Sequence, residues 1–563
     1  MREKRLWGTL DPFLEGGSVL GRKVANAGFL DALLAADPFD EYHFFLAAED
    51  AAASLREALV QKHPALERRG AFRFPLRAAL PGELRRRNYH CFHLSDFVDR
   101  HPAVSLIRNK YSPRLFPVTS VTHSLSYKDF MTAYLAHLWP GASERDAIVV
   151  TSRSAASVLE NAFAALREQY GIAHSGPSLP RIPLGVDVLR APPADEDMEA
   201  LCRRLGHDKE GELLFLCLSR ISAHSKMDFL PVLAACKRAE KLGLAPGGYR
   251  LVLAGWVEDD DPLPEAFAAL AASLGIRFSV VPRPAARERD ALYHLADVFL
   301  SPSDNIQETF GLTVIEAGAA GTPVIASDFD GYKDTVIHGV TGLLAPVTGF
   351  GASGETNALA AVWLDNQYHF KLAQETAVDV PALAESLARL AQDRDLRERM
   401  GEAAKRHVRE QFAWPHVIAR YCSLWDELWT IPLDHEREQS LRAADHPLQM
   451  DFARIFRAHF TGVVSADTAM TVRRTALGEA FYRGVFPTLP YAGLDMMLDT
   501  DALRRLLFLA RRPVSGAAAL AELAAHFAKT DAAPPLPAAF PEERAAFLLL
   551  WALKQDLVEK TES

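Results

Sequence analysis

Short apolar runs alternate with stretches of helical periodicity through the first part of the chain. The apolar runs predict β-strands, and apolar positions three and four residues apart predict helices. The predicted strands are residues 42–46, 89–94, 116–121 and 147–151, and the predicted helices are 26–36 and 152–170. Alternation of this kind predicts a parallel sheet with helices on its faces.

The same pattern begins again after a proline-containing connection at residues 183–187 and 192–193. The next predicted strands are 213–219, 250–255, 278–281, 298–301 and 323–327, with helices at 227–241 and 311–321. We therefore expect two doubly wound α/β domains in tandem, residues 1–188 and 189–430, facing each other across a cleft. The final helices of the second can pack back on the first. In such sheets, ligands bind at the carboxyl ends of the strands.

Residues 431–563 have a different pattern, in which helical periodicity dominates and a proline-rich stretch interrupts it. Helices are predicted at 503–510, 516–528 and 542–557. This order also occurs in helix-turn-helix modules, but 15 Lys+Arg against 17 Asp+Glu leave the segment slightly acidic, which argues against a nucleic-acid partner. We expect a mainly helical accessory domain that serves protein docking or oligomerisation.

Composition narrows the class of protein. The 563 residues are 49% hydrophobic and 24% charged, with a net charge of −10, which is typical of a folded globular chain and argues against a polyanion-binding protein. Five cysteines lie far apart without zinc-site spacing, so we expect reduced thiols. No apolar run approaches about 18 residues and the start has no apolar signal core, so a cytoplasmic location is expected.

The segment from Ser301 to Pro323 is the most informative for chemistry. A strand is predicted to end at Ser301, a polar loop carries Glu308, and a helix begins near Gly311. Backbone N–H groups at that helix end would point at an anion, and a glycine there lets a phosphate approach closely. These N–H groups belong to Phe310, Gly311, Leu312 and Thr313.

Two carboxylates flank this predicted phosphate site. Glu308 precedes the helix end and can accept hydrogen bonds from sugar hydroxyls, and Glu316 can accept from a second pair such as a ribose diol. An acid near a helix start is also favoured by the helix dipole alone. That simpler explanation does not account for Gly311 or for a second acid eight residues after the first.

This arrangement resembles the retaining nucleotide-sugar glycosyltransferases of family GT4, the group 1 glycosyltransferases. The resemblance rests on Glu308 and Glu316 with Phe310-Gly311 between them and the Gly-Thr-Pro-Val-Ile-Ala-Ser run at 321–327. It extends to 296–298 and 339–344 and covers about residues 1–430. The resemblance implies the GT-B fold of two facing Rossmann-like domains, with the first on the acceptor side and the second binding the nucleotide sugar.

Other parts of the chain follow the family in order. Gly16 and Gly17 resemble its N-terminal glycine loop, which approaches the donor phosphate and the acceptor. His123 follows a predicted strand where the family keeps a histidine facing the donor sugar. Arg220 and Lys226 match the cationic pair on the donor diphosphate, where fixed positive charge stabilises the leaving group. Lys226 departs from the family in spacing and is followed by Met-Asp instead of glycine.

The resemblance also implies a reaction. A hexose would pass from a nucleotide diphosphate sugar to a hydroxyl of a glycan, lipid-linked or protein acceptor, in bacterial polysaccharide, lipopolysaccharide or glycoconjugate synthesis. Transfer would be metal-independent, with the acceptor attacking on the face that the diphosphate leaves and a phosphate oxygen taking the proton. The alternatives are a non-catalytic GT-B partner subunit, or a disaccharide synthase or phosphorylase-like enzyme on the same fold.

Three further motifs have simpler explanations. Residues 349–354 match the letters of a dinucleotide-binding loop but lack a convincing βαβ context, so we interpret residues 348–378 as an insertion, a lid or a specificity element. The acidic residues 258–261 are interpreted as a solvent loop and not as a metal site. The arginines of residues 68–87 are either solvated faces or a peripheral contact with anionic lipid at the inner face of the membrane.

Overall fold

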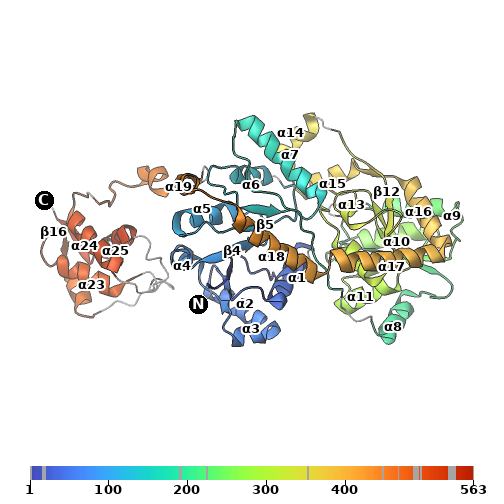
Figure 1. Cartoon of the computed structure of the whole chain (residues 1–563), viewed down its shortest axis with the longest axis horizontal. Helices are drawn as coiled ribbons and strands as arrows, with labels where there is room; N and C mark the ends of the chain where they lie inside the picture. Colours follow the sequence, from blue (N-terminus) through green and yellow to red (C-terminus); the bar gives the residue numbers. More distant parts are fainter. Residues whose placement is uncertain are drawn as a thin grey trace.

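The computed structural model describes two α/β lobes followed by a smaller C-terminal unit (Figure 1). The N-lobe comprises residues 3–188 together with the helices that return to it after residue 413, and the C-lobe comprises residues 193–413. The described residues are 3–15, 21–127, 129–188, 193–222, 226–351, 354–446, 449–466, 468–485, 494, 498–529 and 541–561.

A six-stranded parallel sheet forms the centre of the N-lobe, in the order β3-β2-β1-β4-β5-β6. Its strands are buried, as expected for a sheet covered by helices on both faces. The strands are β1 Leu6–Thr9, β2 Glu41–Phe44, β3 Phe72–Arg73, β4 Tyr89–Leu94, β5 Val118–Val121 and β6 Ala147–Val149. The helices are α1 Gly21–Ala36, α2 Glu49–Lys62, α3 Pro64–Arg68, η1 Arg77–Ala79, α4 Leu80–Arg86, α5 His101–Tyr111, α6 Phe130–His137 and α7 Arg153–Tyr170.

The C-lobe repeats this topology, with the strand order β9-β8-β7-β10-β11-β12, again all parallel. The strands are β7 Leu213–Leu218, β8 Tyr249–Gly255, β9 Arg277–Pro282, β10 Val298–Ser301, β11 Val324–Ser327 and β12 Gly342–Ala345. The helices are α8 Asp195–Leu205, α9 Leu230–Glu240, α10 Leu263–Ser273, α11 Ala286–Leu295, α12 Leu312–Ala320, α13 Tyr332–Thr335, α14 Gly354–Trp363, α15 Asn366–Gln374, α16 Val380–Gln392 and α17 Arg394–Gln411. Two doubly wound lobes in tandem are therefore confirmed.

Each strand predicted from the sequence overlaps an observed strand, but within the two six-stranded sheets β1, β3 and β12 are missing from the prediction. The omission of β1 matters most, because this strand lies between β2 and β4 at the centre of its sheet. Its four residues, Leu-Trp-Gly-Thr, follow a charged start and form no apolar run. Burial of this strand is therefore a consequence of tertiary packing and not of a local hydrophobic signal.

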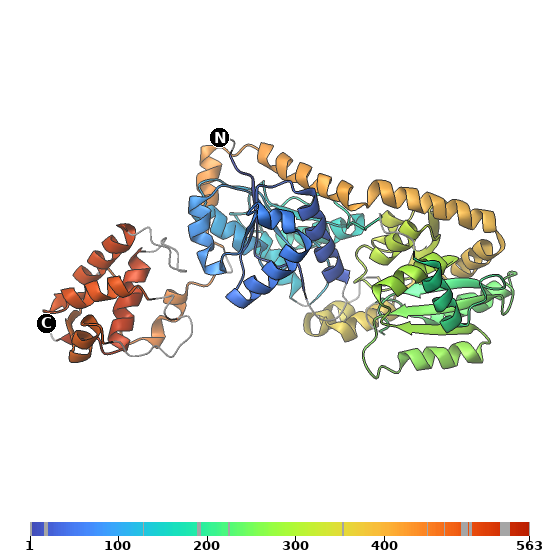
Figure 2. The same ribbon diagram turned by 90° about the horizontal axis from the view of Figure 1, so that it is seen from below.

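The chain crosses between the lobes twice, and the two crossings lie side by side. In the proline-containing connection, the Val186 N–H donates to the carbonyl of Phe412, and the Trp414 N–H donates back to the carbonyl of Val186. A Cβ on Gly185 would lie 2.3 Å from the Trp414 ring, so glycine lets the crossings approach. After the second crossing, α18 Trp414–Thr430 packs into the N-lobe core through residues such as Trp425. Figure 2 shows α17 and α18 running along the two lobes in turn.

The segment after α18 contains two structurally different parts. Helix α19 His435–Ala443 packs on the N-lobe, where the carbonyl of its buried Leu441 accepts from the Asn109 amide. A separate unit with its own apolar core follows at the far end of the molecule (Figure 1). Its elements are α20 Phe452–Ile455, η2 Arg457–His459, β15 Thr471–Arg474, α21 Ala476–Tyr482, α23 Thr500–Leu509, β16 Val514–Ser515, α24 Gly516–Lys529, α25 Pro541–Lys554 and β17 Val558–Thr561. This unit is mainly helical, as predicted, with a small antiparallel sheet β16-β15-β17.

Several arginines of the basic segment 68–87 have partners within the N-lobe. Arg69 forms an ion pair with Asp37, and Arg86 and Arg87 both pair with Glu83. A run of basic residues in the sequence is thus partly a set of internal ion pairs, and contact with anionic lipid through this segment stays a prediction. Within the described ranges, no helix is both long enough and apolar enough to cross a bilayer.

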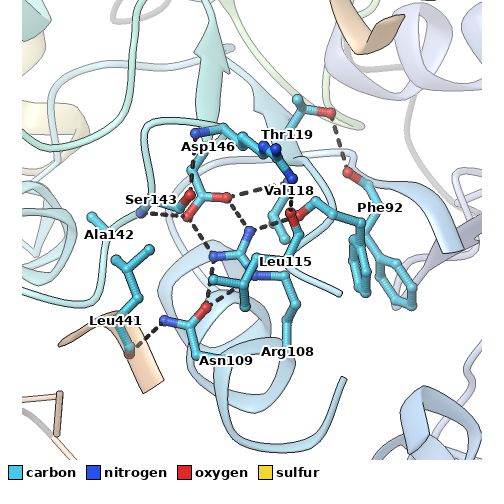
Figure 3. Close-up of polar contacts among 12 residues, drawn as sticks. Phe92, Arg108, Asn109, Leu115, Val118, Thr119, Ala142, Ser143, Asp146 and Leu441 are labelled. Atoms are coloured by element: carbon cyan, nitrogen blue, oxygen red, sulfur yellow. Dashed lines mark hydrogen bonds and ion pairs between the residues drawn. The ribbon is translucent and has the colours of Figure 1, made fainter. Parts of the chain in front are cut away.

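A fully buried ion pair joins α5 to the loop before β6 (Figure 3). The Arg108 guanidinium faces both carboxylate oxygens of Asp146, and it also donates to the Phe116 carbonyl. The adjacent Asn109 donates to the Leu441 carbonyl, which brings α19 into the same network. Because the two charges are removed from water, each depends on the other for solvation.

Replacing Arg108 by methionine is expected to lower the free energy of unfolding by about 3–5 kcal/mol, since it leaves the Asp146 carboxylate buried without a cation. The thermal unfolding temperature of the full chain measures this effect. Arg114→Met is the matched control, because Arg114 and its partner Glu3 are each 53% exposed and such pairs contribute little. Equal unfolding temperatures for the two variants would contradict the structural role of the buried pair.

Candidate functional site

A cleft of about 640 Å³ lies between the two lobes. Its walls are built mainly by segments that follow the carboxyl ends of parallel strands, which is where doubly wound sheets bind ligands. The N-lobe contributes segments after β1, β4 and β5, and the C-lobe contributes segments after β7, β8, β9, β10 and β11. Of the residues predicted from the sequence, the cleft is lined by His123, Arg220, Lys226, Glu308, Phe310, Gly311, Leu312, Thr313 and Glu316.

The pairing of β7 with β10 brings Lys226 close to Glu308 and places Arg220 in the same cleft. Arg220 and Lys226 follow β7, and Glu308 follows β10, so neighbouring strand ends hold residues that are far apart in sequence. This is the point in the sheet where the strand order reverses, since β8 and β9 lie on one side and β11 and β12 on the other. Lys226 Nζ lies 2.7 Å from Glu308 Oε2.

Glu308 is 6% exposed and is held by two donors. Its Oε2 accepts from Lys226 and, at 3.2 Å, from the Tyr332 hydroxyl. Since the Tyr332 proton is directed at the carboxylate, the Ser301 hydroxyl must donate to the Tyr332 oxygen, at 2.6 Å. Burial, and then the Glu308 charge, raise the pKa of Tyr332 well above its ordinary value, so this phenol stays a donor. The orientation of Glu308 is therefore set by fixed groups around it.

Helix α12 begins at the cleft, with Gly311 as its N-cap at φ +95°. A Cβ at this position would lie 2.3 Å from the Tyr332 ring, and the left-handed backbone is also unfavourable for other residues. From the sequence, this glycine is expected to let a phosphate approach closely. The structure gives a second reason for glycine here. The Tyr332 ring packs against the Gly311 backbone while its hydroxyl donates to Glu308, so a side chain at residue 311 would displace the ring. Leu312 and Thr313 of the first turn line the cleft.

Glu316 lies in α12, where its Oε2 accepts from the Tyr293 hydroxyl at 2.8 Å. Burial and the Glu316 charge raise the pKa of Tyr293 well above its ordinary value. A carboxylate has about four acceptor positions, so one hydrogen bond from Tyr293 fixes its orientation and leaves acceptor capacity. Glu316 lines the cleft and can receive a pair of hydroxyl groups there.

His123 lies on the N-lobe wall of the cleft and is 7% exposed. Its Nε2 lies 3.0 Å from both the Asn26 side-chain oxygen and the Ser95 carbonyl oxygen, which are acceptors. Nε2 therefore carries the proton and donates. Burial lowers the pKa of this ring to about 3, with the Arg22 charge adding to the effect. The neutral ring has an unprotonated Nδ1, so His123 is an acceptor for hydroxyl groups and not an acid.

The structure adds residues that the sequence analysis missed. Asp96 follows β4 and lines the N-lobe wall, and burial raises its pKa to about 6. Trp256 follows β8 and Arg283 follows β9, both line the cleft, and the guanidinium lies 4.5 Å above the indole ring. These residues share a position just after a strand of a doubly wound sheet. Finding them from the sequence would require every strand to be assigned first. Asn366 and His369 of α15 also line the cleft.

Three other predictions have different outcomes. Gly16 and Gly17 lie outside the described residues. The 349–354 motif follows the two-residue strand β13 Val347–Thr348, which pairs antiparallel with β14 Ala377–Val378. The segment between these two paired strands is therefore an insertion. It is not a βαβ unit, which requires parallel strands. In the acidic loop, Asp259 pairs with Arg283 and Asp261 accepts from the backbone N–H of Leu263. Within the described ranges, no three His, Cys, Asp or Glu side chains are arranged to hold a metal ion.

Comparison with known proteins connects this geometry to a family. Residues 204–355 match the family model of the glycosyl transferases group 1, and this segment contains Arg220, Lys226, Glu308 and Glu316. The chain is 34% identical over 189 residues to the D-inositol 3-phosphate glycosyltransferase of Corynebacterium efficiens, covering 33% of this chain and 36% of that protein. It is 33% identical over 279 residues to the enzyme of the same name from Nocardia farcinica, covering 49% and 51%. The matched segments thus span about a third to a half of these relatives.

Solved structures share the two-lobe architecture. The glycosyltransferase from Rickettsia africae is 15% identical, with a TM-score of 0.52 over 77% of this chain and 100% of that one. The HepE protein of Anabaena, crystallised with UDP and glucose, is 14% identical, with a TM-score of 0.50 over 76% of this chain and 100% of that one. We conclude that this chain has the two-lobe GT-B fold and that its residues 204–355 are similar to the glycosyl transferases group 1.

Proposed function

We propose that this protein transfers a hexose from a nucleotide diphosphate sugar to an acceptor hydroxyl, with retention of anomeric configuration. The observation that carries the proposal is the grouping of Arg220, Lys226 and Glu308 with the start of α12 at the β7–β10 switch point of a cleft between two lobes. The cations and the helix N-terminus suit a diphosphate, and the Glu308 carboxylate suits the hydroxyl groups of a sugar next to it. The match of residues 204–355 to the group 1 family supports the same assignment.

The donor diphosphate would bind between the cations and the N-terminus of α12. Backbone N–H groups and the helix dipole favour an anion there, and Glu316 is available to the ribose hydroxyls at the next turn. Lys226 is bound to Glu308 in this structure. A diphosphate would compete for that ammonium group, so donor binding would free the carboxylate for the hydroxyls of the hexose.

Transfer requires stabilisation of the charge that appears on the leaving nucleoside diphosphate. Arg220 and Lys226 are fixed cations at that position, and such preorganised charge is among the largest contributions to rate. We propose that these groups supply the positive charge without a metal ion. A phosphate oxygen takes the acceptor proton as the new bond forms on the face that the diphosphate leaves.

The acceptor would approach from the N-lobe. Asp96 and the neutral His123 lie on that wall, and both are hydrogen-bond acceptors when Asp96 is ionised. Such a wall suits a hydroxyl-rich ring as the acceptor. The curated relatives are named for D-inositol 3-phosphate, so this compound is the first acceptor to test.

Nucleotide sugars should raise the unfolding temperature of the protein, because a ligand bound only by the folded state stabilises it. UDP-glucose is tested first because the HepE structure holds UDP and glucose, followed by the corresponding GDP, ADP and TDP sugars.

With the stabilising donor, Glu308→Gln is expected to reduce transfer by about 100-fold or more, with the unfolding temperature of the free protein retained. Arg220→Ala is expected to weaken binding of the free nucleoside diphosphate as well. Transfer should continue in EDTA.

The control for both variants is Arg203→Ala on α8, where Arg203 pairs with Glu199 and both side chains are at least 70% exposed. This change should leave binding and transfer unaltered. Wild-type transfer by both Glu308→Gln and Arg220→Ala would refute the proposed site. Release of sugar phosphate on addition of inorganic phosphate would favour the phosphorylase alternative.

The pH dependence of transfer should report Asp96. Because its pKa is raised to about 6, the carboxylate is protonated below that pH, loses its charge and accepts more weakly from the acceptor hydroxyl. We expect kcat/KM for the acceptor to fall below about pH 6, and Asp96→Asn to lower kcat/KM at higher pH and to remove this acidic limb. An Asp96→Asn enzyme with an unchanged rate and an unchanged acidic limb would exclude this role.

A further inference from the structure

The insertion between β13 and β14 folds into two helices, α14 and α15, and α15 lies between the two lobes in both views (Figures 1 and 2). The start of α15 is fixed by Asp365, whose carboxylate accepts from the backbone N–H groups of Gln367 and Tyr368. The Tyr368 side chain is buried, and its hydroxyl donates to the Thr356 carbonyl of α14. The two helices therefore form one defined element, and we call α15 the cap helix.

The cap helix contacts both lobes through one buried side chain. His369 is 1% exposed, and its Nε2 lies 2.5 Å from the carbonyl oxygen of Ser126 in the N-lobe loop after β5. The Gln307 amide nitrogen donates to the same carbonyl at 2.9 Å and lies 2.8 Å from His369 Nε2. The Tyr127 ring packs edge-on against the His369 ring, with centroids 5.0 Å apart. His369 thus holds together the N-lobe loop and the residue directly before Glu308.

The Gln307 amide also has an unsatisfied end. Among the described residues, its side-chain oxygen is buried and has no hydrogen-bond partner. Buried polar atoms of this kind are uncommon and need an explanation. Because Gln307 and His369 both donate to the Ser126 carbonyl, the cap helix and the amide beside Glu308 are held at the same point of the N-lobe.

One turn before His369, the exposed Asn366 lines the cleft on the same face of the cap helix. Tyr127 and Phe130 of the N-lobe line the cleft as well. A polar amide together with aromatic rings is a surface that suits a sugar, whose hydroxyls form hydrogen bonds and whose ring carbons pack on the aromatic side chains. Trp256, Arg283 and Glu316 line the cleft on segments after β8, β9 and β10 and are available to the nucleoside.

We propose that the cap helix forms the sugar-contacting wall of the cleft, with Asn366 as a residue that binds the hexose of the donor and His369 as a positioning residue that acts through Gln307. This inference rests on the proposed function, because it assigns part of the same cleft. The insertion then makes the enzyme selective for a donor that carries its sugar, and it shields the hexose from water once the lobes have closed on it.

Comparing the affinities for UDP and UDP-glucose isolates the sugar contribution, and isothermal titration of the full chain measures both. Asn366→Ala and His369→Ala should each weaken UDP-glucose binding by about 3- to 10-fold, the effect of one lost hydrogen bond, while UDP binding stays unchanged. His369→Gln can still donate to the Ser126 carbonyl, so it should recover most of the lost affinity. A merely structural role for His369 would change UDP and UDP-glucose binding together.

Gln367→Ala is the matched control, because Gln367 is the neighbouring exposed amide of the cap helix and does not line the cleft. It should bind both ligands as the wild type does. If the wild type binds neither UDP nor UDP-glucose, the proposed donor and this inference both fail. If the wild type binds both and the Asn366→Ala and His369→Ala variants keep its ratio of affinities, this inference alone is overturned.

Discussion

The parallel pairing of β7 with β10 is the constraint on which the cleft depends. Two strands that follow β7 in the chain, β8 and β9, lie on its other side, so the carboxyl ends of β7 and β10 become neighbours without a direct connection between them. A loop that follows β7 and a loop that follows β10 can then face each other in an open crevice. Lys226 and Glu308 meet there at 2.7 Å, and the helix that follows β10 directs its first turn into the same space.

Burial raises the pKa of two further carboxyl groups near this point, Asp304 and Asp330, and so favours their neutral forms. Burial raises the pKa of Asp304 to about 7, and burial together with the Glu308 charge raises the pKa of Asp330 well above its ordinary value. The raised pKa of Asp330 favours its neutral form beside Glu308, and Tyr332 remains a neutral donor to Glu308. The cation of Lys226 is directed at the Glu308 carboxylate, and in the proposed function a bound diphosphate would compete for it.

The lobes are joined by elements that hold the cleft in place from several sides. The two crossings of the chain pair with each other at Val186 and Phe412, and α18 is part of the N-lobe core although it follows the C-lobe in sequence. Across the cleft, Arg153 at the start of α7 pairs with Asp334 in α13, and the His369–Ser126 contact lies on the cap helix. The first pairing is backbone to backbone, and each of the others involves at least one side chain, with both the backbone N–H and the guanidinium of Arg153 donating to Asp334.

Local sequence determines the repeated α/β pattern, because apolar runs buried on both faces of a parallel sheet are visible without the fold. It also determines the strand, loop and helix that carry Glu308, Gly311 and Glu316, since these lie within one short segment. The central strand β1 has no such signal, because its burial comes from neighbours supplied by β2 and β4. Asp96, Trp256 and Arg283 likewise become site residues only through the order of the strands they follow. The contact of His369 with Ser126 joins residues of the two lobes, and only tertiary packing could bring together side chains so far apart in the chain.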